Sequence, residues 1–142
     1  MGRGEQILNE RKRKLDALRK IINPYPHRFE VKDYSFAIKE TYKHLANDER
    51  TQEYVVVAGR VMTIRNLGKL IFVTLQDARG KLQLIFQKGE TESKSFELFA
   101  DYVDNADFIG ASGIIMKTRT VEVSVLVKKC EVLSKSLLPL PE

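Results

Sequence analysis

The chain has 142 residues, of which 43% are hydrophobic and 30% charged, and its net charge of +5 gives a modest preference for polyanions. This composition predicts one globular domain with some additional chain, and no stretch approaches the ~18 consecutive apolar residues that a membrane span requires. The charged N-terminus predicts no secretory signal, and the single cysteine, Cys130, excludes an internal disulfide or a cysteine zinc cluster, so we expect a cytoplasmic protein.

The first 20 residues concentrate positive charge, with seven Lys and Arg residues against three Asp and Glu residues. Residues 5–21 contain no Gly or Pro and predict a helix with a narrow apolar stripe, which the Asn-Pro-Tyr-Pro tract at 23–26 would end. This basic helix is open to three interpretations: a solvated surface, a contact with a partner subunit, or binding to RNA.

A second helix is expected over residues 34–45, with Asp33 or Ser35 as its N-cap. Its expected apolar contacts are Phe36, Ile38, Tyr42 and Leu45. Residues 46–53 are polar and predict a connector.

Beyond residue 53 the hydrophobic period changes to two, which predicts strands. The expected strands are 54–65, 70–77, 81–87, 107–116 and 121–133, with a hairpin turn at 77–80 and a helix at 93–103 that buries Phe96, Phe99 and Val103. Gly59 predicts a bulge or bend that lets a long first strand serve both sides of a closed barrel. The order β-β-β-α-β-β predicts a mainly β fold, a five-stranded Greek-key barrel of the OB type preceded by N-terminal helices.

Alternation along the strands separates a core face from an outer face. The residues expected in the core are Ile71, Val73, Leu75, Leu82, Leu84, Phe86, Val121, Val123, Val125 and Val127. The opposite faces carry Phe72, Thr74, Gln76, Lys81, Gln83, Ile85, Gln87, Glu122, Ser124 and Leu126. Among these, Phe72, Gln83 and Glu122 near the basic segment 65–69 predict a platform for single-stranded RNA, because a ring stacks a base and polar groups bind its edge.

Each of these residues also has an ordinary structural explanation. The N-terminal helices could cover Phe72, and Gln83 and Glu122 could simply face solvent. The cations Arg65, Lys69, Arg79 and Lys81 could keep strand ends soluble and discourage edge pairing.

Catalytic motifs are not recognisable in this sequence. We find no phosphate-binding loop, no G-x-S-x-G elbow and no H-E-x-x-H motif, and His27 and His44 lack partners at metal-ligand spacing. We therefore expect neither catalytic residues nor a metal site in this chain.

Four segments carry a recognisable pattern. They are R-K-L-D-A-L-R-K-I-I-N-P-Y-P-H-R-F at 13–29, V-A-G-R-V-M-T-I-R-N-L-G-K-L-I-F-V-T-L-Q-D at 57–77, G-K-L-Q-L-I-F at 80–86 and L-L-P-L-P-E at 137–142. Together they resemble the N-terminal anticodon-binding domain of class II lysyl-tRNA synthetases over nearly the whole chain. The barrel pattern is shared with aspartyl- and asparaginyl-tRNA synthetases, whereas the N-P-Y-P-H-R-F segment and the P-L-P-E ending point to the lysyl member.

The resemblance implies that the barrel holds the anticodon loop of a tRNA with uridine at its middle position. The stacking phenylalanine of the family falls on Phe72, its uridine-reading glutamine on Gln83, its turn arginine on Arg65 and its strand-five glutamate on Glu122. Lys69 and Lys81 complete the expected nucleic-acid-binding set. The implied domains are a helical extension at 1–53, the barrel at 54–136 and a linker at 137–142.

The resemblance also implies a lysine–tRNA ligase as the parent enzyme. This chain would hold no cofactor and bind no membrane, and ATP and magnesium would serve a catalytic domain absent from it. A homodimer formed through the parent enzyme is left open, as is the choice between an excised domain and a free-standing relative.

The chain departs from the family pattern in two segments. Residues 106–113 read A-D-F-I-G-A-S-G where the family usually has G-D-I-V-G-V-x-G, and Val121 stands where a glycine usually precedes the glutamate. The second change could redirect the hairpin that carries Glu122. Two alternatives remain: a generic single-strand-binding or assembly module, and the corresponding domain of an aspartyl- or asparaginyl-tRNA synthetase.

Overall fold

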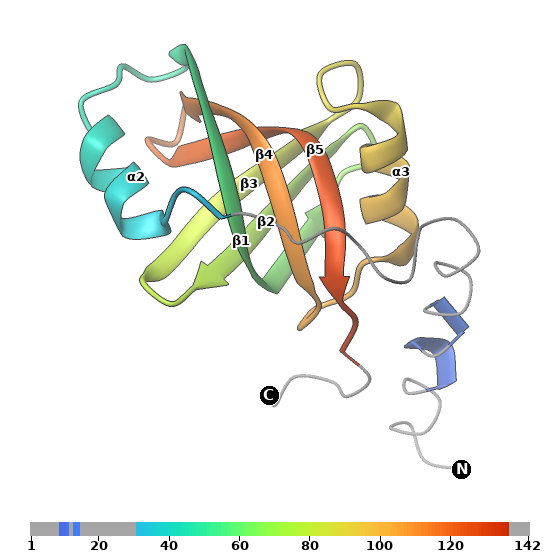
Figure 1. Ribbon diagram of the computed structural model, residues 1–142. Coiled ribbons are helices and arrows are strands. Elements are labelled where there is room, and N and C mark those ends of the chain that lie inside the picture. The colour runs from blue at the N-terminus through green and yellow to red at the C-terminus, as the bar shows by residue number, and fades with distance from the viewer. Residues whose placement is uncertain (1–8, 12, 15–30, 137–142) are drawn as a thin grey trace.

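The computed structural model describes residues 9–11, 13–14 and 31–136, and these form a closed five-stranded barrel with a helix at each end (Figure 1). Its elements are α2 (Ser35–Tyr42), β1 (Arg50–Asn66), β2 (Leu70–Asp77), β3 (Gly80–Gln87), α3 (Ser93–Tyr102), β4 (Phe108–Lys117) and β5 (Val123–Ser134). The strand order is β1-β2-β3-β5-β4, with β3 and β5 parallel and the other pairs antiparallel. The predicted fold class is therefore confirmed. No helix in the described part of the chain is long and apolar enough to cross a membrane.

Strand β1 closes the barrel because it pairs with two different neighbours. Its residues 50–60 lie beside β4 and its residues 60–66 lie beside β2, as the sequence predicted for a long first strand. The connector prediction for residues 46–53 is wrong in its second half. Residues 50–53 belong to β1, because backbone pairing with β4 extends the strand through polar side chains that show no apolar alternation.

Gly59 does not form the predicted bulge. The register of β1 against β2 shifts between Val61 and Thr63, whereas Gly59 pairs regularly with Ile109. A Cβ atom at Gly59 would lie 2.5 Å from the carbonyl oxygen of Gln76. The glycine is therefore required by the close approach of the next strand, and the bulge forms beside it.

The barrel interior contains nine of the ten predicted core residues. Val121 is the exception: it is 57% exposed, precedes β5, and has a φ of 67° in the left-handed region. α3 closes one end of the interior, where the ring of Phe99 stacks on that of Phe86 with centroids 4.2 Å apart. Its predicted apolar face is confirmed, since Phe96, Phe99 and Val103 are buried.

α2 closes the opposite end of the barrel (Figure 1). The predicted N-caps are wrong: Asp33 accepts a hydrogen bond from the backbone N–H of Val56, and the N-cap is Tyr34 without a side-chain cap bond. Instead, the backbone N–H of Ser35, at the start of α2, donates to the Asp77 carboxylate at 2.7 Å. At the other end Lys117 donates to the carbonyl of Lys43 at 2.8 Å, so each helix end meets a charge of complementary sign.

The contacts predicted for α2 are only partly found. Ile38 and Leu45 are buried and Tyr42 packs against the core, but Phe36 is 62% exposed. The helix presents Ser35 and Ile38 to the barrel, which leaves Phe36 on its outer side.

Two basic residues of the N-terminal arm contact the barrel. Arg11 is buried and donates to the carbonyl of Ser136, and Lys14 pairs with Asp104 at 2.8 Å. Asp104 also pairs with Lys135, whose buried ammonium group contacts Asp107. The remainder of the predicted first helix, the proline tract and the ending at 137–142 lie outside the described residues.

Candidate nucleic-acid interface

The outer face of β1, β2 and β3 carries three rows of side chains that run across the strands. Strand register defines them as Arg65–Phe72–Ile85, Thr63–Thr74–Gln83 and Arg60–Gln76–Lys81. The rows change from largely apolar, through neutral polar, to basic as they approach the β2–β3 turn. This face is the outer surface on which the sequence placed a base-reading platform.

Phe72 occupies the centre of the first row. It is half-buried and lies directly between Arg65 on β1 and Ile85 on β3. Ile85 and Leu126 do point outward as predicted, yet they are buried, because they pack with Met116 in a second apolar cluster outside the barrel interior. Phe72 packs against this cluster, which supports its ring from one side.

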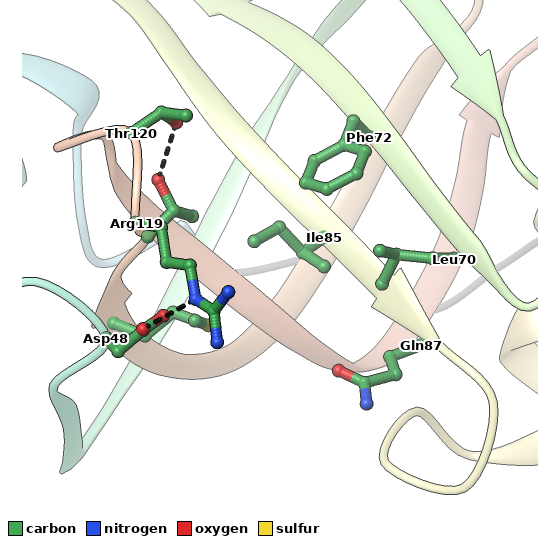
Figure 2. A pocket seen from close by; sticks show the side chains of 9 residues that line it. Asp48, Leu70, Phe72, Ile85, Gln87, Arg119 and Thr120 are labelled. Atoms are coloured by element: carbon green, nitrogen blue, oxygen red, sulfur yellow. Dashed lines mark hydrogen bonds and ion pairs between the residues drawn. The ribbon is translucent and has the colours of Figure 1, made fainter.

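An open pocket of about 310 Å³ lies beside Phe72. Its lining residues are Asp48, Leu70, Phe72, Ile85, Gln87, Met116, Thr118, Arg119 and Thr120. Figure 2 shows Phe72 and Arg119 on opposite sides, with Ile85 between them. The Arg119 Nε atom lies 3.0 Å from Asp48 Oδ2, and this exposed ion pair forms one rim of the pocket.

Gln83 lies in the second row, opposite Thr74 of β2 and Ser124 of β5. The hydroxyl of Thr63 donates to that of Thr74 at 2.8 Å, so these two neighbours satisfy each other. Within the described residues, the side-chain amide of half-buried Gln83 has no hydrogen-bond partner. Its donor and acceptor groups are therefore available to a ligand.

Glu122 is half-buried in the hairpin between β4 and β5, outside the residues that line the pocket. Its backbone fixes the hairpin: its N–H donates to the Thr118 hydroxyl at 3.2 Å, and its carbonyl accepts from the Thr118 N–H at 3.0 Å. The structure thus brings Thr118 and Thr120, rather than Glu122, to the pocket wall.

The predicted cations lie around this face. Arg65, Lys69 and Lys81 are exposed, and none forms an ion pair with a carboxylate in the described part of the chain. Sequence reasoning missed Arg60, which shares a row with Lys81 and is also exposed. The sequence does carry a signal for Arg60, because alternation places it outward beside the inward Val61. Sequence reasoning also missed Arg119 and Asp48, which come together only when the barrel closes.

Two further groups of side chains in the described part of the chain bear on the kind of site. Burial raises the pKa of the Cys130 thiol, which keeps it protonated and unreactive in the folded chain. Among residues 9–11, 13–14 and 31–136, no three His, Cys, Asp or Glu side chains gather where they could hold a metal ion.

Comparison with known proteins places this barrel in a family. Residues 55–133 match the tRNA anticodon family model, described as an OB-fold nucleic acid binding domain. The chain belongs to that family.

Its relatives are more specific than the family model. The chain is 39% identical over 92% of its length to the lysine–tRNA ligase of Fervidobacterium nodosum, and 38% identical over 97% to the chloroplastic/mitochondrial lysine–tRNA ligase of Arabidopsis thaliana. It is 36% identical over 91% of its length to the lysine–tRNA ligase of Methanoculleus marisnigri. The chain spans about a quarter of these relatives, matching 25%, 24% and 26% of their lengths. It therefore corresponds to the anticodon-binding OB-fold domain of lysine–tRNA ligases.

Proposed function

We propose that this chain reads the anticodon of lysine tRNA on the outer face of β1, β2 and β3. The observation that carries the proposal is the first row, in which a supported aromatic ring has an exposed arginine on one side and borders a pocket. An aromatic ring on a cationic face is the usual platform for an unstacked base.

Each predicted residue has a separate role in this proposal. Phe72 stacks the middle uridine, and Gln83 and Arg65 hydrogen-bond its edge or the neighbouring phosphate. Glu122 reads a flanking base, while Lys69 and Lys81 add salt-sensitive contacts with phosphates. The basic arm contributes less than its composition suggested, because Arg11 and Lys14 are engaged with the barrel.

The activity of the whole protein is part of the same proposal. A lysine–tRNA ligase would use this domain to select its tRNA and would activate lysine with ATP and magnesium in another domain. Cytoplasmic location and a homodimer formed through the parent enzyme accompany that proposal.

Exchange of tRNAs tests the choice of lysine. Anticodon stem-loops of lysine, aspartate and asparagine tRNAs share the middle uridine and differ at flanking positions, so titration of each against this chain isolates the flanking contacts. We expect tightest binding to the lysine loop and a reduced preference in Glu122→Gln. Equal affinity for the three loops would contradict lysine specificity.

A further inference from the structure

An exposed aromatic ring and a cation lie beyond the three rows, at the turn between β2 and β3. The guanidinium carbon of Arg79 lies 5.1 Å from the centroid of the Tyr34 ring. Tyr34 is 40% exposed and Arg79 is exposed, so both groups remain accessible to a ligand. The pair has the geometry of a cation–π contact.

One carboxylate fixes the backbone on both sides of this pair. Asp77 Oδ1 accepts from the N–H groups of Arg79 and Gly80 at 2.8 and 3.0 Å, and Oδ2 accepts from the N–H of Ser35, next to Tyr34, at 2.7 Å. The hydroxyl of Ser35 also donates to Asp77 at 2.7 Å. The turn and the start of α2 are therefore held together before any ligand binds, which lowers the ordering cost of binding.

The pair is continuous with the proposed interface. Asp77 lies five positions after Phe72 on β2, a distance of about 17 Å at a rise of about 3.3 Å per residue. The basic row lies between them, and it contains Arg60, Gln76 and Lys81.

The positive charge that runs from the basic row to Arg79 is not neutralised by a carboxylate of the described residues. Arg60, Arg79 and Lys81 are exposed, and no carboxylate of the described residues forms an ion pair with any of them. Asp77, the nearest carboxylate in sequence, is already occupied by its backbone hydrogen bonds. Exposed cations that follow one another across the strands and into the adjoining turn favour the phosphates of an extended single strand over a protein partner.

We propose that the RNA-binding surface extends to the Tyr34–Arg79 pair, where an unpaired nucleotide flanking the anticodon stacks on Tyr34. Arg79 and Arg60 contact the phosphates that lead to it. This inference rests on the proposed anticodon-binding function and adds a fourth nucleotide position to it. The contact is indifferent to base identity, because a stacked ring offers no donors or acceptors that distinguish bases.

Binding of RNAs of two lengths distinguishes the Tyr34–Arg79 site from the anticodon-binding face. Fluorescence anisotropy would compare a uridine trinucleotide with a uridine nonanucleotide on the wild-type chain and on the Tyr34→Ala/Arg79→Gln double variant. We expect the variant to bind the nonanucleotide about fivefold to thirtyfold more weakly, with a salt dependence less steep by about one phosphate contact. Binding of the trinucleotide should be unchanged.

Two further variants keep the test specific. Tyr54→Ala removes another exposed tyrosine, 55% accessible on the part of β1 that pairs with β4, and should leave both affinities unchanged. Arg60 is not a hydrogen-bond partner of Asp77, so Arg60→Gln tests a phosphate contact without disturbing the turn. This variant should make the salt dependence of affinity less steep for the nonanucleotide alone. Unfolding midpoints of all variants should match the wild type, since the substituted side chains are at the surface.

The outcomes distinguish this inference from the function on which it rests. No loss in the double variant, or an equal loss for both RNA lengths, would overturn the fourth position. A wild-type chain that binds uridine and cytidine loops equally would overturn anticodon reading instead, while a length-dependent loss would still support the Tyr34–Arg79 contact.

Discussion

Arg65 lies directly opposite Phe72 across the β1–β2 ladder, so a guanidinium group and an aromatic ring share one row of the outer face. Arg65 is exposed and has no ion-pair partner among the described residues, whereas Phe72 is supported by the cluster of Ile85, Met116 and Leu126. This division of roles gives a packed aromatic surface beside an exposed cation.

Replacement of Arg65 tests the cationic half of the row. We expect Arg65→Gln to weaken binding of the lysine anticodon stem-loop several-fold and to reduce the salt slope by about one contact, without a change in folding stability. Lys94→Gln is the matched control, because Lys94 is likewise exposed but belongs to α3 and not to the strands that carry the face. An equal loss in both variants would show that only net charge matters.

The backbone at Val121 predicts a stabilising substitution. A β-branched residue with φ of 67° carries strain of about 1–3 kcal/mol, and Val121 is too exposed to contribute core packing. Val121→Gly relieves this strain but adds an entropy cost of about 0.5–1 kcal/mol for ordering a glycine. The net effect should be a free energy of unfolding that is higher by roughly 1 kcal/mol. Urea unfolding measures this, and Val121→Ala, which keeps a Cβ atom, should gain less. A less stable glycine variant would contradict the strain.

The Asp77 carboxylate joins α2 to the β2–β3 turn, and we expect its contribution to folding stability to be lost at low pH. Burial raises its pKa, but hydrogen bonds from Ser35, Arg79 and Gly80 outweigh that effect and hold the pKa below its usual range. A depressed pKa contributes stability that is complete above the unfolded value, about 3.9, and is lost as pH falls through the lower folded value. The wild-type chain should therefore lose more stability below about pH 4 than Asp77→Asn. Parallel pH profiles of unfolding would exclude this contribution.

Lys135 joins the end of β5 to two carboxylates near the N-terminal arm. Its side chain is 1% exposed and pairs with Asp104 and with Asp107, which is 0% exposed. Lys135→Met leaves a buried carboxylate without its cation and should cost about 3–5 kcal/mol in urea unfolding. Lys14→Met breaks a more exposed pair with Asp104 and should cost about 1 kcal/mol or less. Similar costs for the two variants would contradict this burial argument.

Local pattern predicted most of the barrel because its strands obey local rules. β2 begins and ends where alternation and the turn residues placed it, at Leu70 and Asp77. Residues 50–53 were mistaken for connector because their pairing with β4 is made by backbone groups that no side-chain pattern reveals. Val121 was placed in a strand because it extends the alternation of Val123, Val125 and Val127, whereas hairpin closure sets its conformation.

Sequence alone predicted those residues of the candidate site whose orientation follows from a single strand. It did not predict the contacts that form when the barrel closes. Alternation placed Phe72 and Gln83 on the outer face, and the register confirms that orientation. The contacts of Arg119 with Asp48 and of Arg79 with Tyr34 join segments far apart in the chain, so periodicity gives no signal for them.

Recognition of the middle anticodon base is the central claim, and Phe72 tests it most directly. The measurement is titration of the chain, in moderate salt, with a lysine anticodon stem-loop and with the same loop carrying cytidine at the middle position. Three proteins would be compared: wild type, Phe72→Ala and Phe72→Leu, the last retaining apolar contact with Ile85 without a ring to stack. We predict a clear preference for uridine in the wild type that both variants lose. Equal binding of the two loops by the wild type, or an unchanged preference in Phe72→Ala, would contradict it.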